Sequence, residues 1–229
     1  MSRTRSALAL TFGPLTLGWA ALYYFGRTWG STRDERRAVL HGDALVPRPD
    51  SVTDHATTID APPEAVWPWL QQVGWHRGGW YTARWVDRLL FPANQPAAEA
   101  LLPEYSAGLR VGDHVPDGPP ESGCFFHVEV VEPHRLLVLR STTHLPRKLL
   151  DDPRVDLNWT WTFHLQPLEG ERTRFHFRVR MSARPRWIVW VFKAFLVPAD
   201  FVMARSMCAG LKRRAERQAR VASDEPHSA

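Results

Sequence analysis

The 229-residue sequence lacks most of the short motifs that mark catalytic sites. None of its ten histidines forms a His-x-x-x-His pair, and the two cysteines, Cys124 and Cys208, form no Cys-x-x-Cys pair. Neither a Gly-x-Ser-x-Gly elbow nor a glycine-rich phosphate loop is present. We therefore expect no metal, no nucleotide or other cofactor and no catalytic motif. The cysteine count fits a reducing compartment, and one disulfide in an exported protein is the alternative.

The net positive charge is concentrated in one segment. The formal net charge is +5, and residues 205–220 alone carry six basic residues and one acidic residue, which is also +5. The rest of the chain is therefore close to neutral. This distribution argues against a nucleic-acid surface spread over the fold, and it favours a solvated helix face over a specific anion site.

Long uncharged runs are limited to the N-terminus. Residues 7–25 contain no charge, follow two arginines and are just long enough to cross a bilayer as a helix. No convincing cleavage site follows, so residues 1–28 are predicted to be an uncleaved membrane anchor rather than a signal peptide. The arginines after it place the remaining chain on the cytoplasmic side by the positive-inside rule. Residues 187–197 are also apolar, but they are too short to span and could lie on the membrane surface or on the domain.

The remaining sequence alternates between strand and helix patterns. Residues 29–50 are predicted to be a linker or arm, because glycine, proline and aspartate accumulate there. Two short helices are expected at 61–74 and 81–91, followed by a loop or lid at 92–103. In residues 158–166 large apolar side chains alternate with Thr160, Thr162 and His164, which predicts a sheet with one buried and one solvated face. Strands are expected at 52–60, 109–115, 124–132, 135–141, 158–166 and 174–181.

A long helix is predicted for residues 199–220. Pro198 is placed at its first turn, and apolar residues recur at three- and four-residue steps. The apolar side consists largely of small residues, including Ala204, Cys208 and Ala215. Such a face either approaches a sheet closely or leaves empty volume beneath it. In the second case the aromatic strands would line a cavity.

The order of elements and several short segments resemble a known family. The stretch TIDAPPEAVWPWL at 58–70 resembles the entry motif of the START-like, helix-grip superfamily (SRPBCC), in the branch of polyketide cyclase/dehydrase and lipid-transport proteins. HGDALVP at 41–47, RGGWY at 77–81 and VGDHV at 111–115 support the resemblance. It implies an α+β helix-grip fold, with a curved antiparallel sheet of six or seven strands wrapped around the C-terminal helix. The domain would span 51–221, with a disordered tail at 222–229.

Tryptophan is abundant, with eleven residues. Several of them fall in elements that surround the space between sheet and final helix in a helix-grip fold. Large flat side chains recognise apolar ligands, although filling a core is the more frequent role of each one. The candidate ligand-binding residues, with Asp87 and His144 as polar groups at a rim, are Trp80, Tyr81, Trp85, Asp87, His144, Trp159 and Trp161.

Two classes of function follow from such a cavity. In the first, the domain binds or carries a hydrophobic small molecule or lipid at a membrane; the sequence does not specify the oligomeric state, and a monomer is the default. In the second, a polyketide cyclase or dehydratase uses the same cavity with a positioned acid or base. Binding is favoured, because the predicted inward faces are apolar while His127, His164 and His176 alternate outward.

Overall fold

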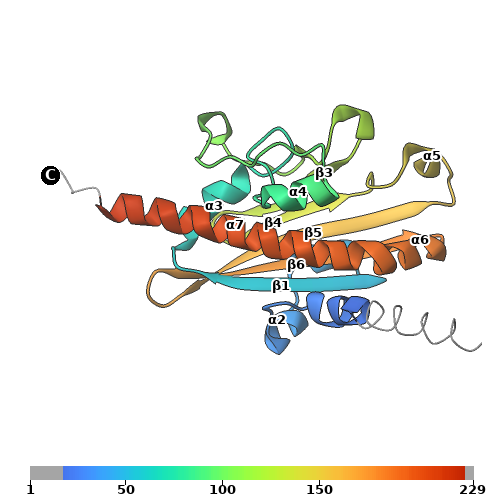
Figure 1. Ribbon diagram of the computed structural model, residues 1–229, viewed down its shortest axis with the longest axis horizontal. Coiled ribbons are helices and arrows are strands. Elements are labelled where there is room, and N and C mark those ends of the chain that lie inside the picture. The colour runs from blue at the N-terminus through green and yellow to red at the C-terminus, as the bar shows by residue number, and fades with distance from the viewer. Residues whose placement is uncertain (1–17, 225–229) are drawn as a thin grey trace, which may run out of the picture.

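The computed structural model describes residues 18–224, which form one antiparallel sheet crossed by a long helix (Figure 1). The six strands lie in the order β1-β6-β5-β4-β3-β2, and every neighbouring pair is antiparallel. Strands β2 to β6 therefore follow one another along the chain, and β1 joins at the edge beside β6. The strands are β1 (Ser51–Ile59), β2 (His114–Pro116), β3 (Phe125–Glu132), β4 (Leu136–Ser141), β5 (Asp156–Leu168) and β6 (Arg172–Arg184).

The helices lie mainly between β1 and β2 and after β6. Figure 1 shows α7 running along the sheet, with α3 and α4 beside it. This is the α+β helix-grip arrangement that the resemblance implies, and the sheet has six strands. The α-helices are α2 (Arg33–Arg37), α3 (Pro63–Gln71), α4 (Arg84–Leu90), α5 (Arg147–Leu150), α6 (Arg186–Val191) and α7 (Val197–Asp224). The 3₁₀ turns are η1 (His41–Leu45), η2 (Pro103–Tyr105) and η3 (Pro120–Ser122), and η4 (Phe192–Leu196) is π-helical.

The strand predicted at 109–115 forms only at its end, as β2. Gly112 adopts a φ of 95°, in the left-handed region. The Asp113 carboxylate accepts the backbone N–H of Arg110 at 2.8 Å. These two features close a turn, which replaces the first part of the expected strand.

The inner face of β5 and β6 carries the core, as the alternation predicts. Phe163 stacks on Phe175 and Phe177, with ring centroids 6.1 Å and 4.9 Å apart. Trp69 of α3 and Leu211 of α7 belong to the same buried cluster. The final helix is thus held on the sheet by burial of apolar area from three elements.

Gly210 permits the closest approach of α7. A Cβ atom at this position would lie 1.8 Å from the carbonyl oxygen of Tyr81, so α7 touches the backbone of the loop before α4. The small-residue face predicts a close approach of the helix, and this approach occurs around Gly210.

The outer face of the sheet is not solvated, contrary to the prediction. Arg178 and His176 of β6 project outward, yet each is only 2% exposed. Both donate toward Asp54 Oδ1 of β1, at 2.7 Å and 2.8 Å. Residues 29–50, predicted to be a linker or arm, cover this face, and Arg178 also donates to Asp43 at 2.7 Å. Buried charges of this kind need partners, and the arm provides them.

The final helix begins earlier than predicted. Helices α6 and α7 are joined through η4, so Pro198 lies inside a continuous helix rather than at its first turn. Proline has no N–H for the carbonyl of Ala194, four residues before it. That carbonyl accepts the indole N–H of Trp19 at 2.8 Å. A π-helical segment and a side-chain donor thus accommodate the proline.

Of the predicted membrane anchor, the described part is the helix at 18–26, and residues 7–17 lie outside the described residues. This helix packs on α7, because a Cβ at Gly26 would lie 2.9 Å from the Phe201 ring. By length and composition, the continuous helix Arg186–Ser223 could also cross a membrane. A core helix of a soluble domain passes the same test, and its inner side carries Leu211 in the core.

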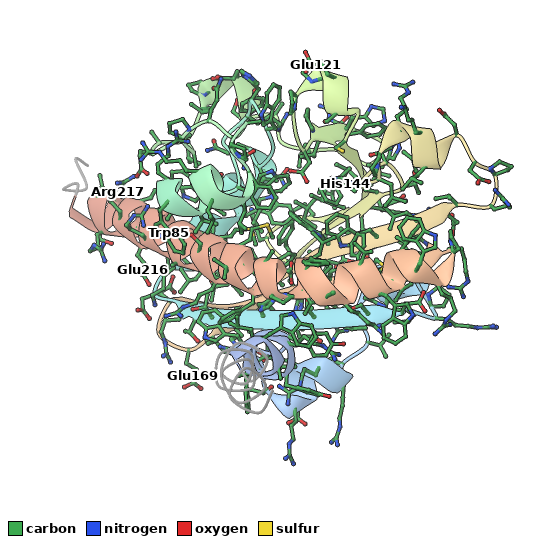
Figure 2. All side chains as sticks on the ribbon, turned by 45° about the vertical axis from the view of Figure 1, so that its right-hand side comes forward. Trp85, Glu121, His144, Glu169, Glu216 and Arg217 are labelled. Carbon is green, nitrogen blue, oxygen red and sulfur yellow. The ribbon has the colours of Figure 1, made fainter. Side chains whose placement is uncertain are left out.

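The basic face of α7 is partly used within the fold. Arg214, which is 2% exposed, donates to the carbonyl of Ala98 at 2.7 Å and pairs with Glu99. Arg217, near the C-terminal end of α7 in Figure 2, also contacts Glu99. The segment 92–103, predicted to be a loop or lid, is therefore tied to the helix. Helix α7 extends to Asp224, into the predicted tail, and residues 225–229 lie outside the described residues.

Candidate functional site

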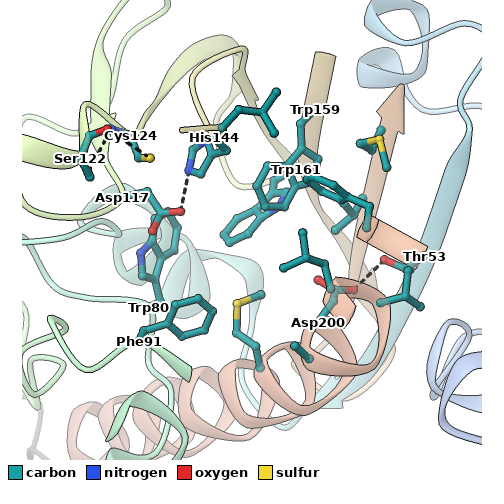
Figure 3. A pocket seen from close by; sticks show the side chains of 18 of the residues that line it. Thr53, Trp80, Phe91, Asp117, Ser122, Cys124, His144, Trp159, Trp161 and Asp200 are labelled. Atoms are coloured by element: carbon teal, nitrogen blue, oxygen red, sulfur yellow. Dashed lines mark hydrogen bonds and ion pairs between the residues drawn. The ribbon is translucent and has the colours of Figure 1, made fainter. Parts of the chain in front are cut away.

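A cavity of about 580 Å³ lies between the inner face of the sheet and the helix formed by α6, η4 and α7 (Figure 3). Strands β1, β5 and β6 contribute one side, and η4 with the first turns of α7 contributes another. The loops that follow Trp80, β2 and β4 close the remaining side. Cavities of about 300–1,000 Å³ with mostly apolar walls are typical of small-molecule sites.

Several aromatic side chains line the cavity. Trp159 and Trp161 stand on the inner face of β5, with ring centroids 5.7 Å apart and nearly perpendicular planes. Trp80 packs edge-on against Trp161 at 5.0 Å. Phe163, the next inward residue, is fully buried and lies in the core beyond the cavity.

The empty volume lies beside the first turns of α7, where Ala199 and Met203 line the cavity. It does not lie beneath the predicted small-residue face, because Ala204, Cys208 and Ala215 are packed in the core.

A polar group stands in the loop wall. The two ring nitrogens of His144 contact Asp117 Oδ2 at 2.8 Å and Ser141 Oγ at 2.6 Å. The ring also packs against Phe126 and Trp159, with centroids 4.6 Å and 4.9 Å away. Its orientation is thus fixed from both nitrogens and from both neighbouring rings.

A second polar group stands on the helix side of the cavity. Asp200 Oδ2 accepts the hydroxyl of Thr53 at 2.9 Å and lies 3.1 Å from Nε2 of His55. The His55 side chain is fully buried, and the Asp200 side chain is 14% exposed. A carboxylate is therefore held on an otherwise apolar wall by residues of β1.

Neither cysteine is an activated nucleophile. Burial raises the pKa of the Cys124 thiol, which lines the cavity and donates weakly to the carbonyl of Ser122. Burial raises the pKa of Cys208 to about 12. Both thiols therefore stay protonated near neutral pH. Among residues 18–224 no group of three or more His, Cys, Asp and Glu is arranged to hold a metal ion.

The structure brings together four of the predicted ligand-binding residues. The residues that line the cavity are Trp80, His144, Trp159 and Trp161.

The other three predicted residues lie elsewhere. Trp85 is 61% exposed, because α4 buries only Val86 and Asp87, and it lies well apart from His144 in Figure 2. Tyr81 is in the core, where its hydroxyl donates to the carbonyl of Trp69 at 2.6 Å and burial raises its pKa. The sequence pattern places aromatic residues near the cavity, but it does not specify which way each one points.

Asp87 is buried behind the cavity wall rather than at its rim. Its Oδ1 accepts the hydroxyl of Thr82 at 2.5 Å and the amide of Asn94 at 3.2 Å. Thr82 and Asn94 both line the cavity. Asp87 therefore positions two lining residues. It does not itself line the cavity.

Sequence reasoning missed two carboxylates of the site. Asp200 lies at the expected start of the final helix, and the structure places it on the cavity wall because the helix begins earlier. Asp117 follows β2 in a loop rich in glycine and proline and carried no periodic signal. A lone acidic residue between apolar neighbours, as at Asp200, was the available signal.

Comparisons with known proteins give similarity of fold alone. No family model and no curated protein matches the chain. Protein MLL2253 from Mesorhizobium loti is 19% identical, with 73% of this chain and 98% of that chain covered and a TM-score of 0.39. Hypothetical protein jhp0584 from Helicobacter pylori is 11% identical, with 78% and 96% covered and a TM-score of 0.45. A norcoclaurine synthase point mutant from Thalictrum is 14% identical, with 71% and 94% covered and a TM-score of 0.40.

Proposed function

We propose that this protein binds and carries a hydrophobic small molecule, of lipid, polyketide or isoprenoid type, at a membrane. The observation that supports this most directly is the cavity of about 580 Å³ with its wall of tryptophans. Close-packed interiors rarely leave such a volume, because the surrounding side chains lose dispersion contacts. An apolar ligand would restore those contacts and cover the partly exposed indole of Trp159.

Membrane attachment is supported by the outer side of the helix that borders the cavity. Trp190 and Phe195 are 67% and 72% exposed, although both are large and apolar. Phe192 and Leu196, of the same segment, line the cavity. The segment thus separates the cavity from an exposed apolar surface. Exposed aromatic residues beside basic ones are typical of segments that lie in a membrane interface.

The N-terminal segment extends the same apolar surface. Trp19 is bonded to η4 through Ala194, and Phe25 of the same helix is 78% exposed. Arg184 and Arg186 stand at the start of α6 and suit anionic lipid headgroups. We therefore place the cavity mouth close to the bilayer, with the domain tethered on the cytoplasmic side by residues 1–28.

Ligand binding is tested by native mass spectrometry of the full-length protein released from its membranes in mild detergent. A stoichiometric apolar adduct is expected. Trp159→Ala and Ala199→Phe, which enlarge and fill the cavity, should reduce it. Trp85→Ala is the matched control, because this tryptophan lies outside the cavity, and it should keep the adduct. Absence of any adduct from wild-type protein, and of binding to an added apolar dye, would refute the proposal.

Attachment through the aromatic surface is tested by flotation with vesicles of anionic and zwitterionic lipid. Trp190→Ser with Phe195→Ser should lower the bound fraction of the full-length protein. Val39→Ser is the matched control on another face, since Val39 is 89% exposed. Equal flotation of the double variant and the control would show that this surface does not contact the lipid.

A second candidate is acid–base catalysis on the bound molecule, as in a polyketide cyclase or dehydratase. The observation that favours it is the His144–Asp117 pair on the cavity wall, which has the geometry of an oriented histidine. His144→Phe should then abolish turnover of a polyketide analogue while the analogue still binds. Turnover that persists in this variant would leave the carrier role as the better account.

A further inference from the structure

We infer that the cavity selects apolar molecules that carry a hydroxyl or amino group and discriminates against those that carry a carboxylate or phosphate. This inference rests on the proposed function and names the ligand class. It follows from the hydrogen-bonding capacity that the wall leaves unused. The apolar wall sets the shape of the ligand, and the polar groups on it set the chemistry of the ligand's head.

Fixed charge on the wall is mostly negative. Among the described residues that line the cavity, the carboxylates are Asp117, Glu121 and Asp200, and Arg147 is the only lysine or arginine. Arg147 and Glu121 are both exposed and lie at the mouth, so the carboxylates inside the cavity are Asp117 and Asp200. An anionic head inside the cavity would find no fixed cation there. A buried ion without a partner is strongly disfavoured.

Three of the hydrogen-bond donors on the wall are engaged within the protein. The hydroxyl of Thr82 and the amide of Asn94 donate to Asp87, behind the wall. The hydroxyl of Thr53 donates to Asp200. In each of these bonds a wall residue uses a donor that an anionic ligand would need. The hydroxyl and amide oxygens of these residues remain available to the ligand as acceptors.

The other potential donors, which include the hydroxyl of Ser51 and the indole N–H of Trp159, carry no positive charge. The indole N–H groups of Trp80 and Trp161 are covered by protein atoms, so a ligand in the cavity does not reach them. Both ring nitrogens of His144 are occupied by Asp117 and Ser141. The neutral groups that remain do not compensate a full negative charge.

Asp200 is the group that would bind the ligand's donor. Its Oδ2 is bonded to Thr53 and His55, whereas no described residue donates to its Oδ1. The side chain is only 14% exposed and faces the cavity (Figure 3). An enclosed carboxylate oxygen favours a donor, and a hydrogen bond to a charged group is stronger than a neutral one. A hydroxyl or ammonium group supplies that donor, and a carboxylate or phosphate adds a like charge.

The test uses three probes that share one alkyl chain, dodecan-1-ol, dodecylamine and dodecanoate, in competition with the neutral dye Nile red on the full-length protein. The alcohol and the amine should displace the dye at concentrations about tenfold or more below that of dodecanoate. Asp200→Asn should weaken binding of the amine and strengthen binding of dodecanoate. The difference between their displacing concentrations should therefore become smaller. Asp156→Asn, at an exposed position of β5, is the matched control and should leave the order unchanged.

The outcomes separate this inference from the proposed function. Dodecanoate that binds as tightly as the alcohol to wild-type protein would overturn the selectivity while leaving a hydrophobic carrier in place. If the difference between the displacing concentrations of the amine and dodecanoate is unchanged in Asp200→Asn, Asp200 is not the group that binds the ligand's donor. Failure of Nile red and all three probes to bind would refute the carrier role and the selectivity with it. The ranking on wild-type protein does not depend on whether the variant folds.

Discussion

Replacing Arg178 with methionine should destabilise the domain more than any single change of surface charge. The guanidinium donates to Asp54 at 2.7 Å and Asp43 at 2.7 Å. It also donates to the backbone carbonyls of Ala38 at 2.8 Å and Glu35 at 2.7 Å. Methionine replaces the aliphatic part of the side chain but removes every one of these bonds. Two enclosed carboxylates and two carbonyls each lose one donor.

The magnitude follows from the burial of these groups. The Arg178 and Asp54 side chains are 2% and 5% exposed, so solvent does not replace the lost partner. Breaking a buried pair by removing one ion costs about 3–5 kcal/mol. His176 remains bonded to Asp54, which favours the lower part of that range. The loss is a large share of a total stability of about 5–15 kcal/mol.

Urea unfolding of the full-length protein in mild detergent measures this change. With a slope of about 2 kcal/mol per molar urea, a loss of about 3–4 kcal/mol lowers the midpoint by about 1.5–2 M. Arg154→Met is the control, because Arg154 pairs with Asp152 on the surface with 86% of its side chain exposed, and no measurable shift is expected. Hydrogen exchange of residues 33–45 should also accelerate in Arg178→Met. Equal midpoints for the two variants would refute the role of the network in holding the arm.

Three further predictions concern the helix and the arm. Leu211→Asp should cost several kcal/mol because the leucine is 1% exposed in the core, whereas Arg213→Ala, with a 60% exposed side chain, should be nearly silent in thermal unfolding. Gly210→Ala should lower the free energy of unfolding by about 1–3 kcal/mol, since its Cβ would meet the Tyr81 carbonyl, and an unchanged urea midpoint would contradict the close approach. Burial raises the pKa of Glu35, but hydrogen bonds from Arg174 and the Thr32 backbone outweigh it and lower the pKa from 4.5 to about 2. Its stabilisation is therefore full above pH 5 and lost as the pH falls toward 2, and Glu35→Gln should flatten urea midpoints measured across that range.

The sequence determined most of the elements and the face of β5 and β6 that carries the aromatic core. Alternation in β5 and β6 requires the tryptophans and phenylalanines to share one face, because successive side chains point to opposite sides of a strand. The prolines at the start of α3 and the small residues along one side of α7 are also local signals. Both helices could therefore be predicted from the sequence. The resemblance to helix-grip proteins then supplied the order in which these elements pack.

Tertiary structure decided which residues meet. The outward side chains of β6 were predicted to be solvated, yet Arg178 is buried because residues distant in sequence fold over it. Asp200 reaches the cavity only because α6, η4 and α7 form one helix, with Trp19 bonded to the carbonyl that Pro198 leaves free. Trp85 and Trp80 are five residues apart, and only the packing of α4 turns one to solvent and the other to the cavity. Such contacts depend on long-range geometry, which periodicity along the chain does not encode.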